Sequence, residues 1–333
     1  MYCSTHPLDG GSRNTGLNVS VMAVTPEMNT LSLILNGKAA NDDALQDAVS
    51  QLRDEGFRID VSVSTKTNGV DDALDKISSN MDDQSNLTLV AGGGDGTVNA
   101  VIGGAYTRGL HERCSFGILP MGTANDLARA IGVPQNDPLA ALRMVIDSDA
   151  LPMDIGLVEN QPFINMVTGG FGAQVTVETD PELKRYLGGF AYALSGLSRL
   201  GELESSEGRI VGDDFEWEGR FLALAVGNGR QAGGGLPLCS DALIDDGKLD
   251  LMIVTDFQDG IQFPTLEELL TPDPEEKQGG FLVRAKSTSF SLECTTAIQL
   301  NLDGEPMTHR KVKFENRKHA LRMHMQPNPL LDA

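Results

Sequence analysis

The amino-acid sequence predicts an α/β domain built on a parallel sheet, followed by a second domain folded as a β-sandwich or a distorted barrel. Strand-like and helix-like segments alternate up to about residue 150, which is typical of parallel sheets covered on both faces by helices. Beyond that point, short strand-like runs separated by turn residues dominate, as in antiparallel sandwiches and barrels. We expect a first domain over residues 29–150, a second over 151–333, and a disordered polar extension over 1–28.

Apolar periodicity defines the elements of the first domain. Leu45, Val49 and Leu52 recur at helical spacing, whereas residues 57–63 alternate between apolar and polar as in a half-buried strand. The expected strands are 31–35, 57–63, 87–91 and 116–119, and the expected helices are 42–55, 70–81, 98–108 and 127–131. This order is that of a parallel sheet whose strands are joined by helices.

Turn residues divide the second domain into strands. A hairpin is expected from 154–158 and 162–167, because Glu159 and Asn160 lie between these two apolar runs. Further strands are expected at 215–219, 221–226, 248–254, 281–292, 297–302 and 311–314. Two helical stretches, near 181–203 and 257–271, interrupt them.

Charge and cysteine usage narrow the class of protein. With 47 acidic and 26 basic residues the chain has a formal net charge of −21, which argues against a nucleic-acid partner because a polyanion would be repelled.

Four widely spaced cysteines without a C-x-x-C pair predict reduced thiols in a cytoplasmic protein. No apolar run reaches the roughly 18 residues that a membrane-spanning helix needs.

A glycine-rich loop at 92–97 carries the strongest functional signal. The short apolar strand before it runs into three glycines, then Asp95, and a helix-compatible segment follows. Glycines let backbone N–H groups approach a ligand closely, and a helix N-terminus adds partial positive charge, so the loop predicts phosphate binding. A carboxylate beside phosphates must hold a metal or handle a proton. The alternative is a glycine-rich turn without a ligand, and neither the Walker pattern nor the dinucleotide fingerprint is present.

The segment Pro-Met-Gly-Thr-Ala-Asn-Asp at 120–126 repeats this design at the end of the next strand. Gly122 and Thr123 can present an amide and a hydroxyl to a phosphate. Asn125 or Asp126 can cap the following helix, and this capping role alone is the alternative interpretation. Two such loops on adjacent parallel strands would lie at the same edge of the sheet.

Three loops in the second half also carry residues suited to chemistry. The glycine-rich stretch 227–235 suggests close backbone approach in a cleft, with Arg230 able to neutralise phosphate or simply solvated. The loop 241–247 holds three carboxylates that suit a hard cation such as Mg²⁺, or form a polar turn. Asp303 and Glu305 flank a glycine, and either could serve as a general base or belong to a surface hairpin turn.

Taken together and in this order, these motifs resemble the diacylglycerol kinase catalytic-domain superfamily, and most closely the bacterial YegS-like lipid kinases. Gly-Gly-Asp-Gly-Thr at 93–97 marks the superfamily, and the resemblance extends from about Asn29 to Met325. The narrower resemblance depends on Leu-Pro-Met-Gly-Thr-Ala-Asn-Asp at 119–126, Gly-Asn-Gly-Arg-Gln-Ala-Gly-Gly-Gly at 227–235 and Leu-Asp-Gly-Glu-Pro at 302–306. It implies an α/β nucleotide-binding domain like that of NAD kinases, a β-sandwich domain, and a lipid site in the cleft between them.

The resemblance also implies roles for individual residues. The ATP-contacting residues would be Gly94, Asp95, Gly96, Thr97, Val98, Asn99, Ala100 and Thr123, together with a strand-end hydroxyl from Ser64 or its neighbour Thr65. A Mg²⁺ or Ca²⁺ site would use Leu243, Asp246 and Lys248, with two backbone carbonyls joining the Asp246 carboxylate. Glu305 would accept the proton of the lipid hydroxyl, with Asp95 as the second candidate for that role.

Two positions depart from the pattern of this superfamily. Many relatives have glutamate where this chain has Ala100, and relatives outside the subgroup often have Asn-Pro where this chain has Asn36-Gly37.

The expected reaction transfers the γ-phosphoryl group of ATP to a lipid hydroxyl, of the phosphatidylglycerol or diacylglycerol class, at the inner face of the membrane. The alternatives are a kinase for a soluble hydroxyl compound such as NAD, and a nucleotide-binding regulator without catalysis.

A helical stripe of apolar residues within 186–200 offers one route to the bilayer. Leu187, Phe190, Leu194 and Leu197 recur at helical spacing, so this face could dip into the membrane interface as a peripheral and transient contact. Packing of the same face into the protein core is the more common use of such a stripe.

Overall fold

In the computed structural model, residues 30–64, 69–80, 87–170, 205–256 and 282–331 are described. The expected extension over 1–28 and the helical stretches near 181–203 and 257–271 lie outside these ranges, as does the apolar stripe within 186–200. Among the residues that the structure describes, no helix is long and apolar enough to cross a membrane.

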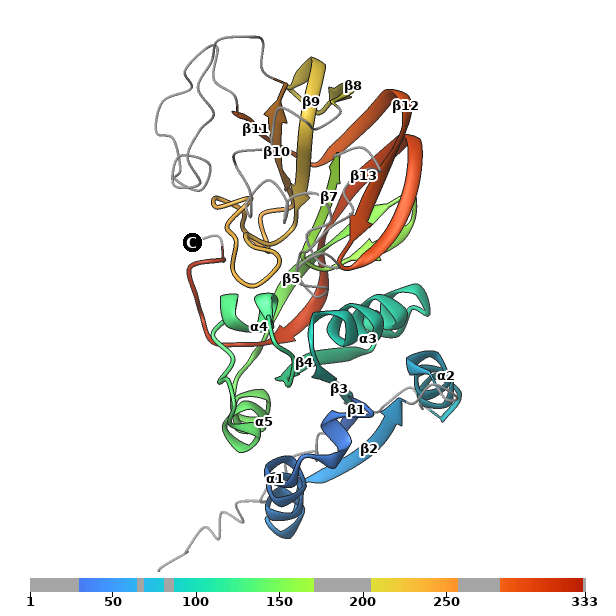
Figure 1. The fold of residues 1–333 in the computed structure, drawn as a ribbon. Coiled ribbons are helices and arrows are strands. Elements are labelled where there is room, and N and C mark those ends of the chain that lie inside the picture. The colour runs from blue at the N-terminus through green and yellow to red at the C-terminus, as the bar shows by residue number, and fades with distance from the viewer. Residues whose placement is uncertain (1–29, 65–68, 81–86, 171–204, 257–281, 332–333) are drawn as a thin grey trace, which may run out of the picture.

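Helices flank a group of parallel strands in the N-terminal half (Figure 1). The strands are β1 (Thr30–Asn36), β2 (Arg58–Ser64), β3 (Leu87–Gly93) and β4 (Cys114–Pro120). The helices are α1 (Asp43–Asp54), α2 (Val70–Asn80), α3 (Asp95–Thr107), α4 (Asp126–Ala130) and α5 (Pro138–Asp147). The pairs β1–β2, β1–β3 and β3–β4 are all parallel, in the spatial order β4-β3-β1-β2. The carboxyl ends of β1, β3 and β4 therefore meet at one edge of the sheet.

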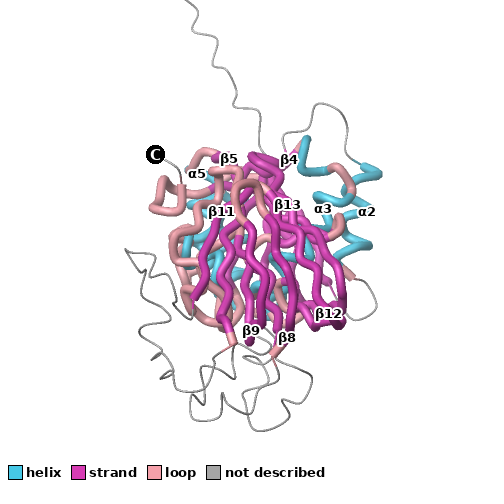
Figure 2. Tube along the Cα trace, turned by 90° about the horizontal axis from the view of Figure 1, so that it is seen from above, coloured by secondary structure: helices cyan, strands magenta, loops and turns pink. Residues whose placement is uncertain are grey.

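The C-terminal half consists mainly of antiparallel strands, which lie side by side in Figure 2. They are β5 (Ala150–Val158), β6 (Gln161–Phe163), β7 (Met166–Gly170), β8 (Ser206–Val211), β9 (Glu216–Gly227), β10 (Leu249–Thr255), β11 (Leu282–Ser287), β12 (Ser289–Leu302) and β13 (Glu305–His324). Within the described residues all strands belong to one 13-stranded sheet, because β13 pairs with β4 in addition to β12 and β5.

Two large apolar cores stabilise the two halves. The first surrounds the parallel strands and includes the fully buried Leu33 and Val90. It also includes Leu321 and Met323 from the far end of β13, so the end of the chain packs against the beginning. The second core is built around buried phenylalanines, which supply much apolar area although aromatic residues form only 5% of the sequence. These phenylalanines are Phe163, Phe221, Phe290 and Phe314. The described cysteines Cys114, Cys239 and Cys294 are free and buried.

Several expected boundaries need correction. Helix α3 begins at Asp95, three residues before the expected start, because the glycine loop itself turns into the helix. The segments expected at 215–219 and 221–226 form the single strand β9, and the short strand expected at 311–314 lies within the 20-residue β13. Helix α5 was not expected at all, although Asp137 accepts a hydrogen bond from the Ala140 backbone N–H and caps it.

A partly buried polar cluster lies where β13 joins the parallel strands. The Nδ1 of His324 lies 2.9 Å from the backbone oxygen of Ser148, and Nε2 lies 2.9 Å from the hydroxyl of Ser115. The Ser115 hydroxyl in turn lies 2.9 Å from that of Thr88 on β3. Burial lowers the pKa of His324, so the neutral imidazole is favoured in the folded protein.

We predict that His324 makes the folded protein sensitive to acid. Because the pKa of His324 is lowered on folding, its contribution to stability is fully present above about pH 6.5, the pKa of an exposed histidine. As the pH falls below that value the unfolded chain takes up the proton first, and up to about 1.4 kcal/mol per pH unit is lost. Urea unfolding of the wild type and His324→Gln at several pH values measures this. The stability gap between the two proteins should shrink with falling pH, and a constant gap would contradict the prediction.

Candidate active site

Two glycine loops touch at the carboxyl ends of β3 and β4. The Met121 backbone N–H donates to the Gly93 carbonyl oxygen over 2.9 Å. A Cβ built on Gly122 would lie 2.3 Å from the Cα of Gly94, a separation that real Cβ atoms do not show. Only glycine at position 122 allows the two backbones to approach this closely. The prediction that the two loops share one edge of the sheet is therefore confirmed by geometry.

The residues expected to contact ATP gather at this edge. Gly94 is the N-cap of α3, and Gly96, Thr97, Val98, Asn99 and Ala100 form the first turns of this helix. Thr123 is exposed in the loop between β4 and α4. Ser64 ends β2 and pairs with Asn36 of β1, which places it two strands away from the glycine loop.

Asn36 is a site residue whose contact the sequence left open. It ends β1, and its amide lies 3.5 Å from the Thr97 hydroxyl. Its side-chain oxygen accepts hydrogen bonds from the backbone N–H groups of Lys38 and Ala39, over 3.1 and 2.8 Å. Asn36 therefore ties the end of β1 to the start of α3.

Asp95 reaches across to the second glycine loop. Its Oδ1 accepts a hydrogen bond from the Asp126 backbone N–H over 2.7 Å, at the start of α4. Burial raises the pKa of Asp95, while its hydrogen bonds from backbone N–H groups oppose that effect. The expectation that Asn125 or Asp126 caps α4 is wrong, since Asn125 makes no side-chain capping bond and instead accepts from the Gly122 N–H. Asp95 supplies the acceptor at this helix end.

Asp126 joins the two halves of the molecule. Its two carboxylate oxygens each lie 3.1 Å from the backbone nitrogen of Gly234, in the glycine-rich stretch 227–235. The Gln231 side-chain amide donates to the Asp126 carbonyl oxygen over 3.1 Å. Burial raises the pKa of Asp126, and the nearby charge of Asp95 acts in the same direction. The expected close approach of the 227–235 stretch in a cleft is thus observed.

Asp303 lies on the opposite wall of this cleft. Its carboxylate accepts hydrogen bonds from the backbone N–H groups of Ile164, Asn165 and Met166, over 2.6, 3.2 and 2.8 Å. Burial raises the pKa of Asp303 to about 6, against the opposing effect of these three bonds. The carboxylate therefore holds the segment before β7 in place.

A small pocket lies between these walls. It is lined by Asp95, Asn99 and Asp126 from the first half and by Asn165, Thr168 and Asp303 from the second, among others. The side-chain oxygen of Asn99 is buried without a hydrogen-bond partner in the described structure, which marks it as an acceptor available at the pocket. Glu305 is exposed and begins β13, two residues beyond Asp303, and is outside the lining of this pocket.

Arg230 does not face the cleft as a phosphate ligand. Its guanidinium donates to the carbonyl oxygens of Ala242 and Pro329, both over 2.7 Å. The side chain thus fastens the stretch 227–235 to the loop 241–247 and to the C-terminal segment. The positive charge of Arg230 is visible in the sequence, whereas these backbone partners lie far from it along the chain, Pro329 by 99 positions.

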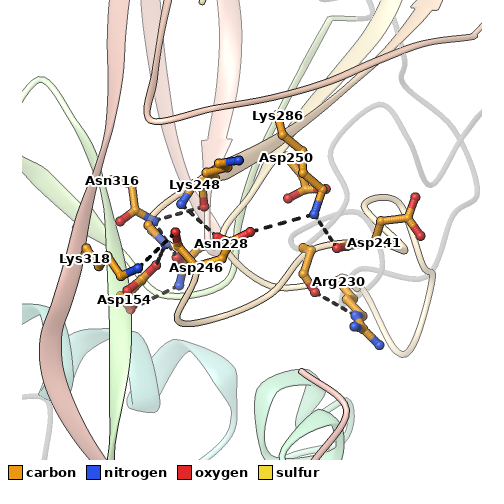
Figure 3. A network of polar contacts seen from close by, with 12 residues as sticks. Asp154, Asn228, Arg230, Asp241, Asp246, Lys248, Asp250, Lys286, Asn316 and Lys318 are labelled. Carbon is orange, nitrogen blue, oxygen red and sulfur yellow. Dashed lines mark hydrogen bonds and ion pairs between the residues drawn. The ribbon is translucent and has the colours of Figure 1, made fainter. Parts of the chain in front are cut away.

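The loop 241–247 is held by a network of polar contacts (Figure 3). Asp154, which is fully buried, accepts hydrogen bonds from the Gly247 and His319 backbone N–H groups, both over 2.7 Å. Asp246 Oδ1 accepts from the Lys248 N–H over 2.9 Å, and the Lys248 carbonyl oxygen accepts from Asn316 over 3.0 Å. The structure describes no group of three or more His, Cys, Asp or Glu side chains able to hold a metal among its placed residues.

Comparison with known proteins matches each half of the chain to a different family model. Residues 30–158 match the diacylglycerol kinase catalytic domain, and residues 165–325 match the YegS C-terminal NAD kinase beta sandwich-like domain. A solved structure of a diacylglycerol kinase from Bacillus anthracis shares the fold with a TM-score of 0.67 at 22% identity, covering 90% of this chain and 97% of the other.

Curated relatives are much closer in sequence. A Pseudomonas aeruginosa protein named "Probable lipid kinase YegS-like" is 43% identical over 304 residues, which cover 90% of this chain and 95% of the relative. A Klebsiella pneumoniae protein of the same name is 42% identical over 306 residues, covering 90% and 97%. With such identity over nearly the full length of its relatives, the chain belongs to the YegS-like lipid kinase family.

Proposed function

We propose that this protein is an ATP-dependent lipid kinase that transfers the γ-phosphoryl group of ATP to a lipid hydroxyl. The observation that carries the proposal is the contact of two glycine loops, at the ends of β3 and β4, beside a pocket that both halves line. Membership of the family and the names of its relatives support the same activity. The lipid is proposed to be of the phosphatidylglycerol or diacylglycerol class.

The proposed ATP site relies on main-chain groups. Backbone N–H groups at Gly94 and Gly96, the start of the 13-residue helix α3, and the hydroxyls of Thr97 and Thr123 can surround the phosphates. Phosphoryl transfer depends mainly on positioning and on neutralising charge, and Mg²⁺ bound to ATP as part of the substrate would supply the remaining positive charge. The polar and partly buried edge of the sheet is suited to holding the phosphates in position.

Glu305 is proposed as the proton acceptor. In the reaction the lipid oxygen forms a bond to the γ-phosphorus, the bond from that phosphorus to the bridging oxygen breaks, and ADP leaves. The hydroxyl proton must pass to a base. Asp95 and Asp303 use their carboxylates to accept backbone N–H bonds, so each has a positioning role. Glu305 is exposed at the start of β13, two residues after Asp303.

The site of action is proposed to be the inner face of the membrane. A lipid hydroxyl is presented there by the bilayer, and a peripheral and transient contact would be sufficient for transfer. Kinases of soluble hydroxyl compounds such as NAD could use a similar phosphate loop, so the identity of the acceptor decides between the two activities.

A transfer assay is predicted to show labelled lipid. The protein would be incubated with ATP labelled at its γ-phosphate, Mg²⁺, and vesicles that contain phosphatidylglycerol or diacylglycerol, with NAD in a parallel reaction. Label in the lipid extract of the vesicles supports the proposal. Label in NAD alone would establish the soluble-substrate kinase instead, and binding of ATP without any transfer would establish a regulator.

Neutralising Glu305 is predicted to abolish most of the activity without unfolding the protein. The Glu305→Gln variant should lower kcat by about 10²–10⁴-fold, since it removes the base but keeps the size of the side chain. Its ATP affinity and thermal unfolding should match the wild type because the side chain is exposed. Glu293→Gln, which changes an exposed acid on β12, is the matched control.

The Asp95→Asn variant is expected to behave differently from Glu305→Gln. It should lower the unfolding temperature and ATP affinity as well as kcat, because it disturbs the hydrogen bond to the start of α4. Near-normal turnover of Glu305→Gln would refute the assignment of the base and leave Asp95 as the remaining candidate.

A further inference from the structure

A lysine on an edge strand contacts three acidic residues around the loop 241–247. The Nζ of Lys286 on β11 lies 2.6 Å from the Asp241 carbonyl oxygen and 3.3 Å from Asp250 Oδ1 (Figure 3). It also lies 3.9 Å from Asp246 Oδ2. Asp250 and Lys286 are directly paired in the β10–β11 register, so the sheet itself positions the ammonium.

The two carboxylates require a cation at this place. The side chains of Asp246 and Asp250 are only 11% and 9% exposed, and both lie beside the same ammonium. In the described structure Asp250 Oδ2 is buried with no hydrogen-bond partner. Two carboxylates beside each other in a largely buried site repel each other and lose hydration, and a positive charge next to both favours their ionised forms.

The residues around the loop do not fit an additional divalent ion. Of the expected ligands, Asp246 already accepts the Lys248 N–H and faces Lys286, and the Lys248 carbonyl oxygen already accepts from Asn316. A divalent ion bound to Asp246 would also lie close to the Lys286 ammonium and be repelled by it.

We propose that the ammonium of Lys286 is the resident cation of this loop and takes the place of the metal expected at Leu243, Asp246 and Lys248. Lys286 is then a positioning residue, and the loop keeps its conformation without a divalent ion. The proposal goes beyond the kinase activity and does not depend on it.

The position of the loop gives Lys286 a connection to the cleft. Arg230 bonds to the Ala242 carbonyl oxygen, one residue after Asp241, and belongs to the stretch whose Gly234 bonds to Asp126. The same stretch contributes Ala232 and Gly233 to the pocket lining. Loss of the ammonium would therefore loosen a wall of the pocket through a chain of hydrogen bonds.

Thermal unfolding without nucleotide tests the proposal. The wild type, Lys286→Met and Lys286→Arg would each be measured in EDTA, in about 10 mM Mg²⁺, and in NaCl of matched ionic strength, because a chain of net charge −21 gains stability from salt alone. For the wild type and for Lys286→Arg, Mg²⁺ and NaCl should raise the unfolding temperature by the same amount. Lys286→Met should unfold about 5 °C lower in EDTA and recover most of that loss only with Mg²⁺, which can then occupy the vacated site.

The control variant is Lys311→Met, which removes an exposed lysine that pairs with Glu293 between β12 and β13. The unfolding temperature of Lys311→Met should rise no more in Mg²⁺ than in NaCl of matched ionic strength. Hydrogen exchange of the loop amides in the wild type should also be unchanged by Mg²⁺, and this measurement remains decisive if Lys286→Met does not fold. Protection of the wild-type loop by Mg²⁺ beyond that given by NaCl would overturn the proposal, as would a Lys286→Met variant indifferent to Mg²⁺.

Discussion

The close approach of two backbones at Gly94 and Gly122 is the constraint on which the rest of the structure depends. Parallel pairing of β3 and β4 brings the ends of these strands together, and the absence of a side chain at position 122 lets their loops touch. Because both helices that follow begin at this contact, the first residue of α3 can reach the first turn of α4. The edge proposed to bind phosphate is thus formed by main-chain geometry, with side chains added to it.

Acidic residues join these loops to the second half of the molecule. Asp95 holds α4, Asp126 holds the Gly234 backbone, and Asp303 holds the segment before β7, each by accepting backbone N–H bonds. Burial of these carboxylates has a cost in free energy that the hydrogen bonds offset. This arrangement explains why a site expected to bind phosphate contains so many acids, since each of these carboxylates in the pocket lining also stabilises a wall of the cleft.

Local sequence patterns were sufficient to predict much of this arrangement. The alternation of strands and helices and the two glycine loops were visible because each depends on residues adjacent in the chain. The roles of Asp126 and Arg230 could not be predicted, because their partners lie 108 and 99 positions away along the chain. The length of strand β13 was underestimated, because much of the strand is exposed and rich in charged residues and its alternation of apolar and polar residues is therefore weak. The role of the buried Asp154 could not be predicted either, because in the sequence it is only a single acidic residue within an apolar strand.

Calorimetric titration of ATP into the Gly122→Ala variant measures whether the contact between the Gly94 and Gly122 backbones is needed for nucleotide binding. The added methyl group would collide with Gly94 and force the two loops apart, whereas at Gly69 a Cβ would meet nothing closer than 3.8 Å. In the presence of Mg²⁺ we expect Gly122→Ala to bind ATP at least about tenfold more weakly than the wild type, equivalent to about 1.4 kcal/mol. The Gly69→Ala control should bind normally. Unchanged ATP affinity in a folded Gly122→Ala protein would contradict this expectation.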